Sequence, residues 1–548
     1  MQTVSASWDK ASRQTLLPEM MVELTYSVTD PNILKETDNL AVWDILEQPS
    51  GGLQLPEVDY RYLLETKHGD PKTPSLLKNA WGLDGTFGYD EDSNEGYVNG
   101  LSNEEDCAFL EETPPGLSIE FDALQEGILP GLSITWSEAL NEWAASFRVT
   151  AYRGDIIIAS TTVYDNTSVV SNVSIDMSGF DKIELQILEW CLPDRRARCN
   201  FLYLGNRLVF TKDDLLGYTH SQSVDLLSAT LPKNSITFRL RNENGQWNPD
   251  NPQGVGRYLM EQQKIEVQYG MKLPGGTEWI PGGVFWLSDW NIPNNGLEVT
   301  LTASSAVSFL NKPYVHPTDG NSYSFYDVGC EIWENAPKPS YQIPLVTIVL
   351  PEDYPFDYNG NGTMAEVLQL MAHASNCIIY QDRTGNLFVW PRQDEWKPWG
   401  QSQLTYVIDE NISYSYPEYQ LGKPLKEVSV GYGNNLRVVI PYNATGETQT
   451  IDNPLITTQE MATLVGENAI DVLRHRKVVT GEFRADLRLD PMDSIIVTSK
   501  YGSTAIILTD IEYSTTGGSF RGKYTGRVVS TVVQNAPYRV GEIYAGEV

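Results

Sequence analysis

The aromatic side chains between residues 81 and 204 are candidates for binding a carbohydrate ligand. An exposed flat ring stacks on a sugar ring, and neighbouring Asp and Asn side chains bind the sugar hydroxyls. Tyr89 and Trp143 lie among polar loop residues and are the better candidates for an exposed platform. The full candidate set for carbohydrate contact is Tyr89, Tyr97, Trp136 and Trp143. The alternative is that strand aromatics such as Trp136, Tyr152 and Trp190 fill a core.

Carboxylates are concentrated in the first part of the same region. Residues 84–126 contain thirteen Asp and Glu and no Lys or Arg. Most such runs are solvated faces, but closely spaced carboxylates are also ligands for Ca²⁺. A calcium site would use Asp90 and Asp92. We expect no other metal and no cofactor.

A second acidic segment matches the first half of an EF-hand loop. It runs Asp357-x-Asn359-x-Asn361-Gly362, but position twelve is Leu368 instead of the bidentate Glu that closes such a site. The segment is therefore interpreted as a turn that leads into a helix capped at Thr363.

Catalytic constellations are not evident in the sequence. The five histidines show no metal-ligand spacing, and there is no H-E-x-x-H, G-x-S-x-G or G-x-x-x-x-G-K-[ST] motif. Glycoside hydrolysis needs two carboxyl groups about 5–10 Å apart. Glu138 and Glu142 are four residues apart, and an enzyme would depend on such a pair. We expect no enzyme.

Composition excludes several classes of protein. Lys and Arg number 39 against 72 Asp and Glu, so the 548-residue chain carries a net charge of −33. This charge argues against binding nucleic acid, which needs clustered cations. Five dispersed cysteines without a C-x-x-C pair indicate neither a disulfide scaffold nor zinc; a Cys191–Cys199 bridge is the less favoured alternative to free thiols. No secretory signal and no run of about 18 apolar residues is present, so we expect no membrane span.

The elements that must position these residues are mainly strands. Alternating apolar and polar residues predict a strand over 21–28. Between residues 81 and 204, short strand-like segments separated by Gly, Pro, Asn and Asp predict an antiparallel β-sandwich. A capping box at Thr363 predicts one helix, followed by a hairpin over 377–390, and Thr457 begins a second helix. The fold class is therefore mainly β (α+β).

Several turn and strand-edge segments resemble bacteriophage tail proteins of the baseplate hub type. The segments that carry the resemblance are 223–232, with the turn Asn242-Glu243-Asn244-Gly245-Gln246-Trp247-Asn248-Pro249, 258–259, 267–270, 278–283, 364–390 and 481–527. Together they imply a relationship over about residues 1–30 and 205–548. The inserted sandwich is similar to a carbohydrate-binding module.

The resemblance implies a multi-domain hub with two β-barrel domains, a small helix–hairpin α/β unit and the inserted antiparallel β-sandwich. The implied domains are 1–40 (first strand of barrel 1), 41–80 (connection), 81–204 (sandwich), 205–330 (remainder of barrel 1), 331–400 (α/β unit) and 401–548 (barrel 2, with a helix at about 458–475).

The resemblance also implies a structural virion protein at the tail tip, made in the host cytoplasm. Its partners would be two further copies in a homotrimer, the tail tube, the distal tail and other baseplate proteins, with phage DNA only passing through the lumen. The sandwich would contact host surface glycan. Two alternatives stay open, a glycan-active depolymerase and the hub of a phage-tail-like injection particle.

Overall fold

The computed structural model describes residues 2–12, 14, 18–32, 40–44, 102–109, 114–137, 140–193, 195, 197, 199, 201–292, 296–316, 322–339, 344–358, 360–392, 406–433, 435–499, 502–515 and 519–532. The mainly β fold class is confirmed, with several antiparallel sheets and few helices. None of the helices in the described residues is long and apolar enough to cross a membrane.

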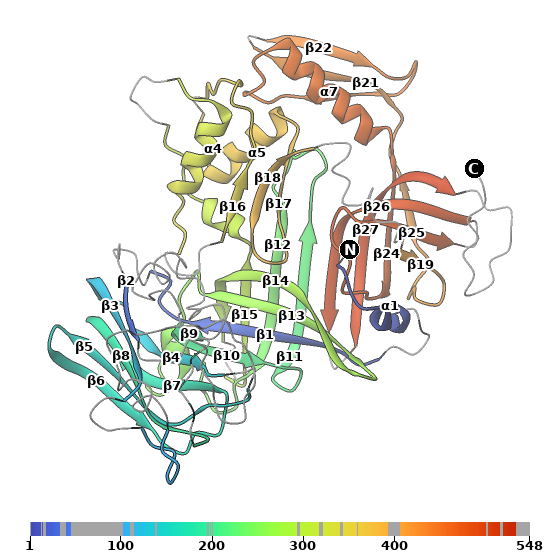
Figure 1. Cartoon of the computed structure of the whole chain (residues 1–548). Helices are drawn as coiled ribbons and strands as arrows, with labels where there is room; N and C mark the ends of the chain where they lie inside the picture. The colour runs from blue at the N-terminus through green and yellow to red at the C-terminus, as the bar shows by residue number, and fades with distance from the viewer. Residues whose placement is uncertain are drawn as a thin grey trace, which may run out of the picture.

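One thirteen-stranded sheet joins the first and last parts of the chain (Figure 1). Its strands are β1 (Met20–Val28), β10 (Asn206–Phe210), β11 (Leu215–Ser223), β12 (Lys233–Arg241), β13 (Lys264–Leu273), β14 (Gly276–Asn291), β15 (Glu298–Ser304), β19 (Tyr406–Ile408), β20 (Glu418–Leu421), β24 (Lys477–Arg484), β25 (Ser494–Ser499), β26 (Gly502–Thr515) and β27 (Phe520–Val532). The order runs β10-β1-β13-β14-β15-β12-β11-β26-β27-β24-β20, while β25 pairs with β26 and β19.

The described strands do not close into the two barrels that the resemblance implies. Instead β11 pairs antiparallel with β26, with Tyr218 opposite Thr515 and Gln222 opposite Ile511. This pairing joins β11, the end strand of the first half, to β26 of the second half, so the two halves share one open sheet.

The N-terminal segment is built into this sheet and its core. Leu24 of β1 lies opposite Phe210 on one side and Val267 on the other. The short helix α1 (Ala6–Ser12) buries Trp8 completely. Its Asp9 and Ser12 bind the buried guanidinium of Arg488, at 3.0 Å each. The first and last hundred residues are therefore held in direct contact.

The part of the chain between β1 and β10 in the sequence forms two smaller sheets that pack as a β-sandwich. One sheet has the order β2-β3-β8-β5-β6 and the other β7-β4-β9. Their bounds are β2 (Leu40–Asp44), β3 (Gly116–Gln125), β4 (Leu129–Thr135), β5 (Ala144–Arg153), β6 (Ile156–Val163), β7 (Val170–Met177), β8 (Phe180–Trp190) and β9 (Phe201–Leu204). The core between them includes Trp136, Phe147, Phe180 and Trp190, all nearly inaccessible.

A helix–hairpin unit packs beside the long strands. It contains α4 (Phe325–Glu334), α5 (Met364–Ala374), β16 (Val346–Ile348), β17 (Cys377–Gln381) and β18 (Leu387–Pro391). The capping box predicted at Thr363 is present, because its hydroxyl accepts from the Glu366 N–H and the Glu366 carboxylate accepts in return. Helix α4, which is not predicted from the sequence, has its own capping box at Ser324 and Asp327. Two short 3₁₀ helices are also present. Val255–Tyr258 lies between β12 and β13, and Ala306–Leu310 follows β15.

The last unit is a helix on a three-stranded sheet. Helix α7 (Gln459–Leu473) is capped by Thr458, one residue after the predicted start, and packs on β21 (Leu425–Tyr432) and β22 (Leu436–Pro441). β23 (Glu447–Ile451) completes the sheet. The domain boundaries proposed from the sequence stay predictions.

Candidate functional site

The four aromatic residues predicted to contact carbohydrate fall into two groups. Tyr89 and Tyr97 lie outside the described residues, as do the calcium candidates Asp90 and Asp92. Among the described residues, no group of three or more His, Cys, Asp and Glu side chains is placed to hold a metal ion.

Trp136 is a core residue of the sandwich. Its ring is fully buried, meets Phe147 and Trp190 edge to face, and donates its indole N–H to the Ser171 hydroxyl at 2.9 Å. No face of this ring is open to a sugar, so the alternative of core packing describes it. Trp143 is partly buried against the same core, and its backbone N–H donates to the Cys191 sulfur at 3.3 Å.

The carboxylate of Glu142, considered for an enzyme, holds the sandwich together. One oxygen accepts from the Trp190 indole at 3.0 Å, and the other lies 3.3 Å from Nε of Arg195. The side chain is almost completely buried. Glu138 lies outside the described residues. A carboxylate held by two internal partners inside a core cannot reach a polymeric substrate.

A different surface of the sandwich gathers polar groups around an aromatic ring. On β5, Phe147, Val149 and Ala151 point into the core, so the residues between them lie on the opposite face of the sheet. Register places Tyr152 opposite Lys182, Thr150 opposite Glu184, and Arg148 opposite Gln186. We call these six residues, Arg148, Thr150, Tyr152, Lys182, Glu184 and Gln186, the polar face.

Hydrogen bonds orient the side chains of the polar face. The Tyr152 hydroxyl donates to Glu184 at 2.7 Å, and the Gln186 amide donates to the same carboxylate at 3.2 Å. The Lys182 ammonium lies 5.5 Å from the centre of the Tyr152 ring. Partial burial, together with the neighbouring Glu184, raises the pKa of Tyr152 to about 12. The phenol therefore remains a hydrogen-bond donor at neutral pH.

The polar face has the groups that a sugar needs. Sugar hydroxyls both donate and accept, and a carboxylate, an amide and a guanidinium beside an aromatic ring match both roles. This face is not predicted from the sequence, where Tyr152 is considered only under the alternative that strand aromatics fill a core. The signal was the alternation with Phe147, Val149 and Ala151, which puts Tyr152 on the other side of the strand.

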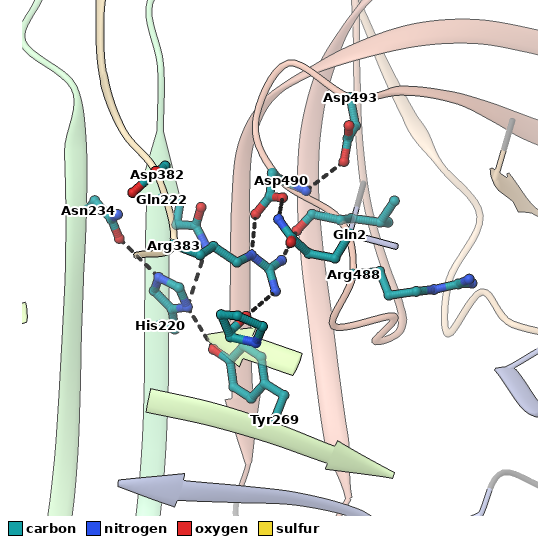
Figure 2. A network of polar contacts seen from close by, with 12 residues as sticks. Gln2, His220, Gln222, Asn234, Tyr269, Asp382, Arg383, Arg488, Asp490 and Asp493 are labelled. Carbon is teal, nitrogen blue, oxygen red and sulfur yellow. Dashed lines mark hydrogen bonds and ion pairs between the residues drawn. The ribbon is translucent and has the colours of Figure 1, made fainter. Parts of the chain in front are cut away.

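A second cluster of polar side chains lies where several segments of the chain meet (Figure 2). We call it the junction network, and its residues are Gln2, His220, Asn234, Tyr269, Arg383 and Asp490. His220 on β11 is buried and lies 2.7 Å from the Tyr269 hydroxyl and 3.0 Å from the Asn234 amide oxygen. Burial lowers the pKa of His220 to about 4. The imidazole is therefore neutral at physiological pH, which suits a hydrogen-bonded core position.

Arg383 is the centre of the junction network. Its Nε donates to Asp490 at 2.7 Å, and its other two nitrogens donate to the carbonyls of Pro281 and Leu489 at 2.8 and 3.1 Å. Gln2 donates to the second oxygen of Asp490 at 2.8 Å. A cavity of about 300 Å³ lies alongside. All three guanidinium nitrogens bind within the chain, so the network acts as a joint between β14, the β17–β18 turn, the N-terminus and the turn before β25.

Comparisons with known proteins give structural neighbours only. No protein-family model and no curated protein matches the chain. It is similar in structure to a tail protein from Neisseria meningitidis MC58 (TM-score 0.42, 11% identity, 59% of this chain and 93% of that one). It is also similar to the 43 kDa tail protein of prophage MuSo2 from Shewanella oneidensis (0.40, 10%, 58% and 95%). A third neighbour is prophage tail protein gp18 from Listeria monocytogenes EGD-e (0.38, 10%, 59% and 91%).

Proposed function

We propose that this chain is a structural protein of a bacteriophage tail tip, forming a trimeric hub whose inserted sandwich contacts host surface glycan. The observation that carries the proposal is the pairing of β1 with both β10 and β13. It makes residues 29–205 an excursion from one sheet, the layout that the resemblance in 223–283 and 364–527 implies for a hub with an insertion.

The internal contacts suit a scaffold. Arg383 ties β14 and the β17–β18 turn to the segment before β25, while Arg488 ties helix α1 to the turn after β24. Both guanidinium groups are nearly inaccessible. Buried, fully bonded charges fix one arrangement of the segments that they join. A hub must keep its shape while other proteins bind it.

The polar face supports the glycan part of the proposal. It combines the Tyr152 ring with the Glu184 carboxylate and the Gln186 amide on one side of a sheet. The sheet that carries this face lies at the lower left of the molecule, away from the helix–hairpin unit and α7 (Figure 1). A particle could therefore present it outward.

Immunolabelling of intact particles tests the location. Antibodies against residues 114–193 should label one end of tailed particles in electron micrographs. Purified protein should sediment as a trimer of 61.4 kDa chains. A chain that is absent from particles and free in the medium would refute the structural role.

Glycan binding is tested on the same particles. Tyr152→Ala should weaken adsorption to host-wall polysaccharide about tenfold or more, since it removes the stacking ring. The matched control is Tyr164→Ala, which removes an exposed tyrosine of the same sandwich that lies off the polar face. Equal adsorption by both variants would show that the polar face does not bind glycan, without affecting the tail-tip assignment.

A further inference from the structure

The sandwich contacts the thirteen-stranded sheet along two lines with a cavity between them. The cavity measures about 280 Å³. Pro130 and Ser174–Asp176 of the sandwich form one wall. The other wall is formed by Val28, Asn206, Leu208, residues 253–255, Arg257 and Tyr258. Because the cavity separates the two contact lines, the sandwich can rotate about one of them when the contacts along the other are broken.

The first contact line is continuous with the backbone. Strand β9 passes into β10 through Gly205, whose N–H donates to the Gly131 carbonyl at 2.9 Å. The Arg207 N–H donates to the Ser133 hydroxyl at 2.8 Å. Gly205 has φ +119°, and a Cβ there would lie 2.5 Å from the Val28 carbonyl oxygen. Only glycine adopts this conformation without strain.

The second contact line depends on one carboxylate. Both oxygens of Asp176 at the end of β7 accept from Nη2 of Arg257, at 2.9 and 2.7 Å, and the Tyr258 hydroxyl also binds Asp176. Arg257 lies over the Tyr258 ring at 4.4 Å. The Asp176 side chain is 56% exposed and that of Arg257 36%. An ion pair this exposed contributes little stability, so it opens readily.

We propose that the sandwich is a hinged arm, with Gly205 and its neighbours as the hinge and the Asp176–Arg257–Tyr258 contact as a latch. Breaking the latch opens the cavity and frees the sandwich to turn on the sheet, while the core of each part stays intact. The inference concerns the chain alone and does not depend on its place in a particle.

Hydrogen exchange and small-angle scattering on the full chain test the hinge together. Asp176→Asn should speed exchange at residues 253–258 about fivefold, the scale of one exposed ion pair, and should increase the maximum dimension. The charge-swapped pair Asp176→Arg with Arg257→Asp should return both readouts close to wild type. The matched control Asp155→Asn, an exposed acid in the β5–β6 turn, should change neither.

Three outcomes overturn the proposal. Unchanged exchange in Asp176→Asn would mean that the β4–β10 contacts fix the sandwich alone. Faster exchange without a larger dimension would mean that only the loop loosens. Faster exchange throughout β5 and β8 would mean that the sandwich unfolds instead of turning.

Discussion

The polar face and the junction network contain the same kinds of residue but use them in opposite ways. Each combines a tyrosine, a carboxylate and a cation within hydrogen-bond or stacking reach. In the junction network the tyrosine and the arginine are buried, Asp490 is about three-quarters covered, and Arg383 binds only other parts of the chain. On the polar face the same groups are partly exposed to solvent. Residue type alone therefore does not separate a binding surface from a structural joint; exposure and bonding partners do.

Removing the central cation of the junction network should have the largest effect. Arg383→Ala leaves Asp490 without its ion-pair partner and two carbonyls without a donor, so we expect a loss of about 3–5 kcal/mol in the free energy of unfolding. Denaturant unfolding measures this. The control is Lys423→Ala, which breaks an exposed pair with Glu447 and should cost less than about 1 kcal/mol. Similar losses of stability in the two variants would contradict the view that the junction network is a structural joint and differs in this from an exposed ion pair.

Acid should weaken the junction network through His220. Its folded-state pKa of about 4 lies below the unfolded value of 6.5, so between these pH values the unfolded chain binds more protons. The contribution is present above pH 6.5 and is lost as the pH falls toward 4, amounting to about 3 kcal/mol. Unfolding should be followed from pH 7 to 4.5 in wild type and in His220→Gln, whose side chain does not titrate. Parallel pH profiles would contradict the assignment.

A substitution on the polar face should have the smallest effect of the three on the free energy of unfolding. Tyr152→Phe removes the hydroxyl that donates to Glu184 but keeps the ring, and we expect a change within about 0.5 kcal/mol because water replaces the lost partner. Thermal unfolding of the sandwich measures it. A loss above about 2 kcal/mol would mean that Tyr152 supports the fold, as the alternative of core packing states.

Local signals in the sequence predicted elements better than they predicted pairing. Thr363 and Glu366 identify their helix because both partners of the capping box are three residues apart. The pairing of β11 with β26 joins residues about 290 apart, and no local pattern reports it. The orientation of Tyr152 is intermediate: alternation along β5 defines two faces, with Tyr152 on the face opposite to Phe147, Val149 and Ala151, but nothing local reports what covers that face. The latch at Asp176 has no sequence signal, since its partners are 81 and 82 residues away.

The placement of α1 and β1 also sets an order in which the chain can fold during synthesis. β1 must wait for β10 and β13, and α1 finds the Arg488 guanidinium only when nearly the whole chain has left the ribosome. Strands β3 to β9 need only one another for nearly all their pairing, so the sandwich can form first. Distant contacts form slowly and leave strand edges open meanwhile. A chain truncated after residue 205 should therefore already hold a protease-resistant sandwich, while β1, which then lacks both β10 and β13, remains open to cleavage.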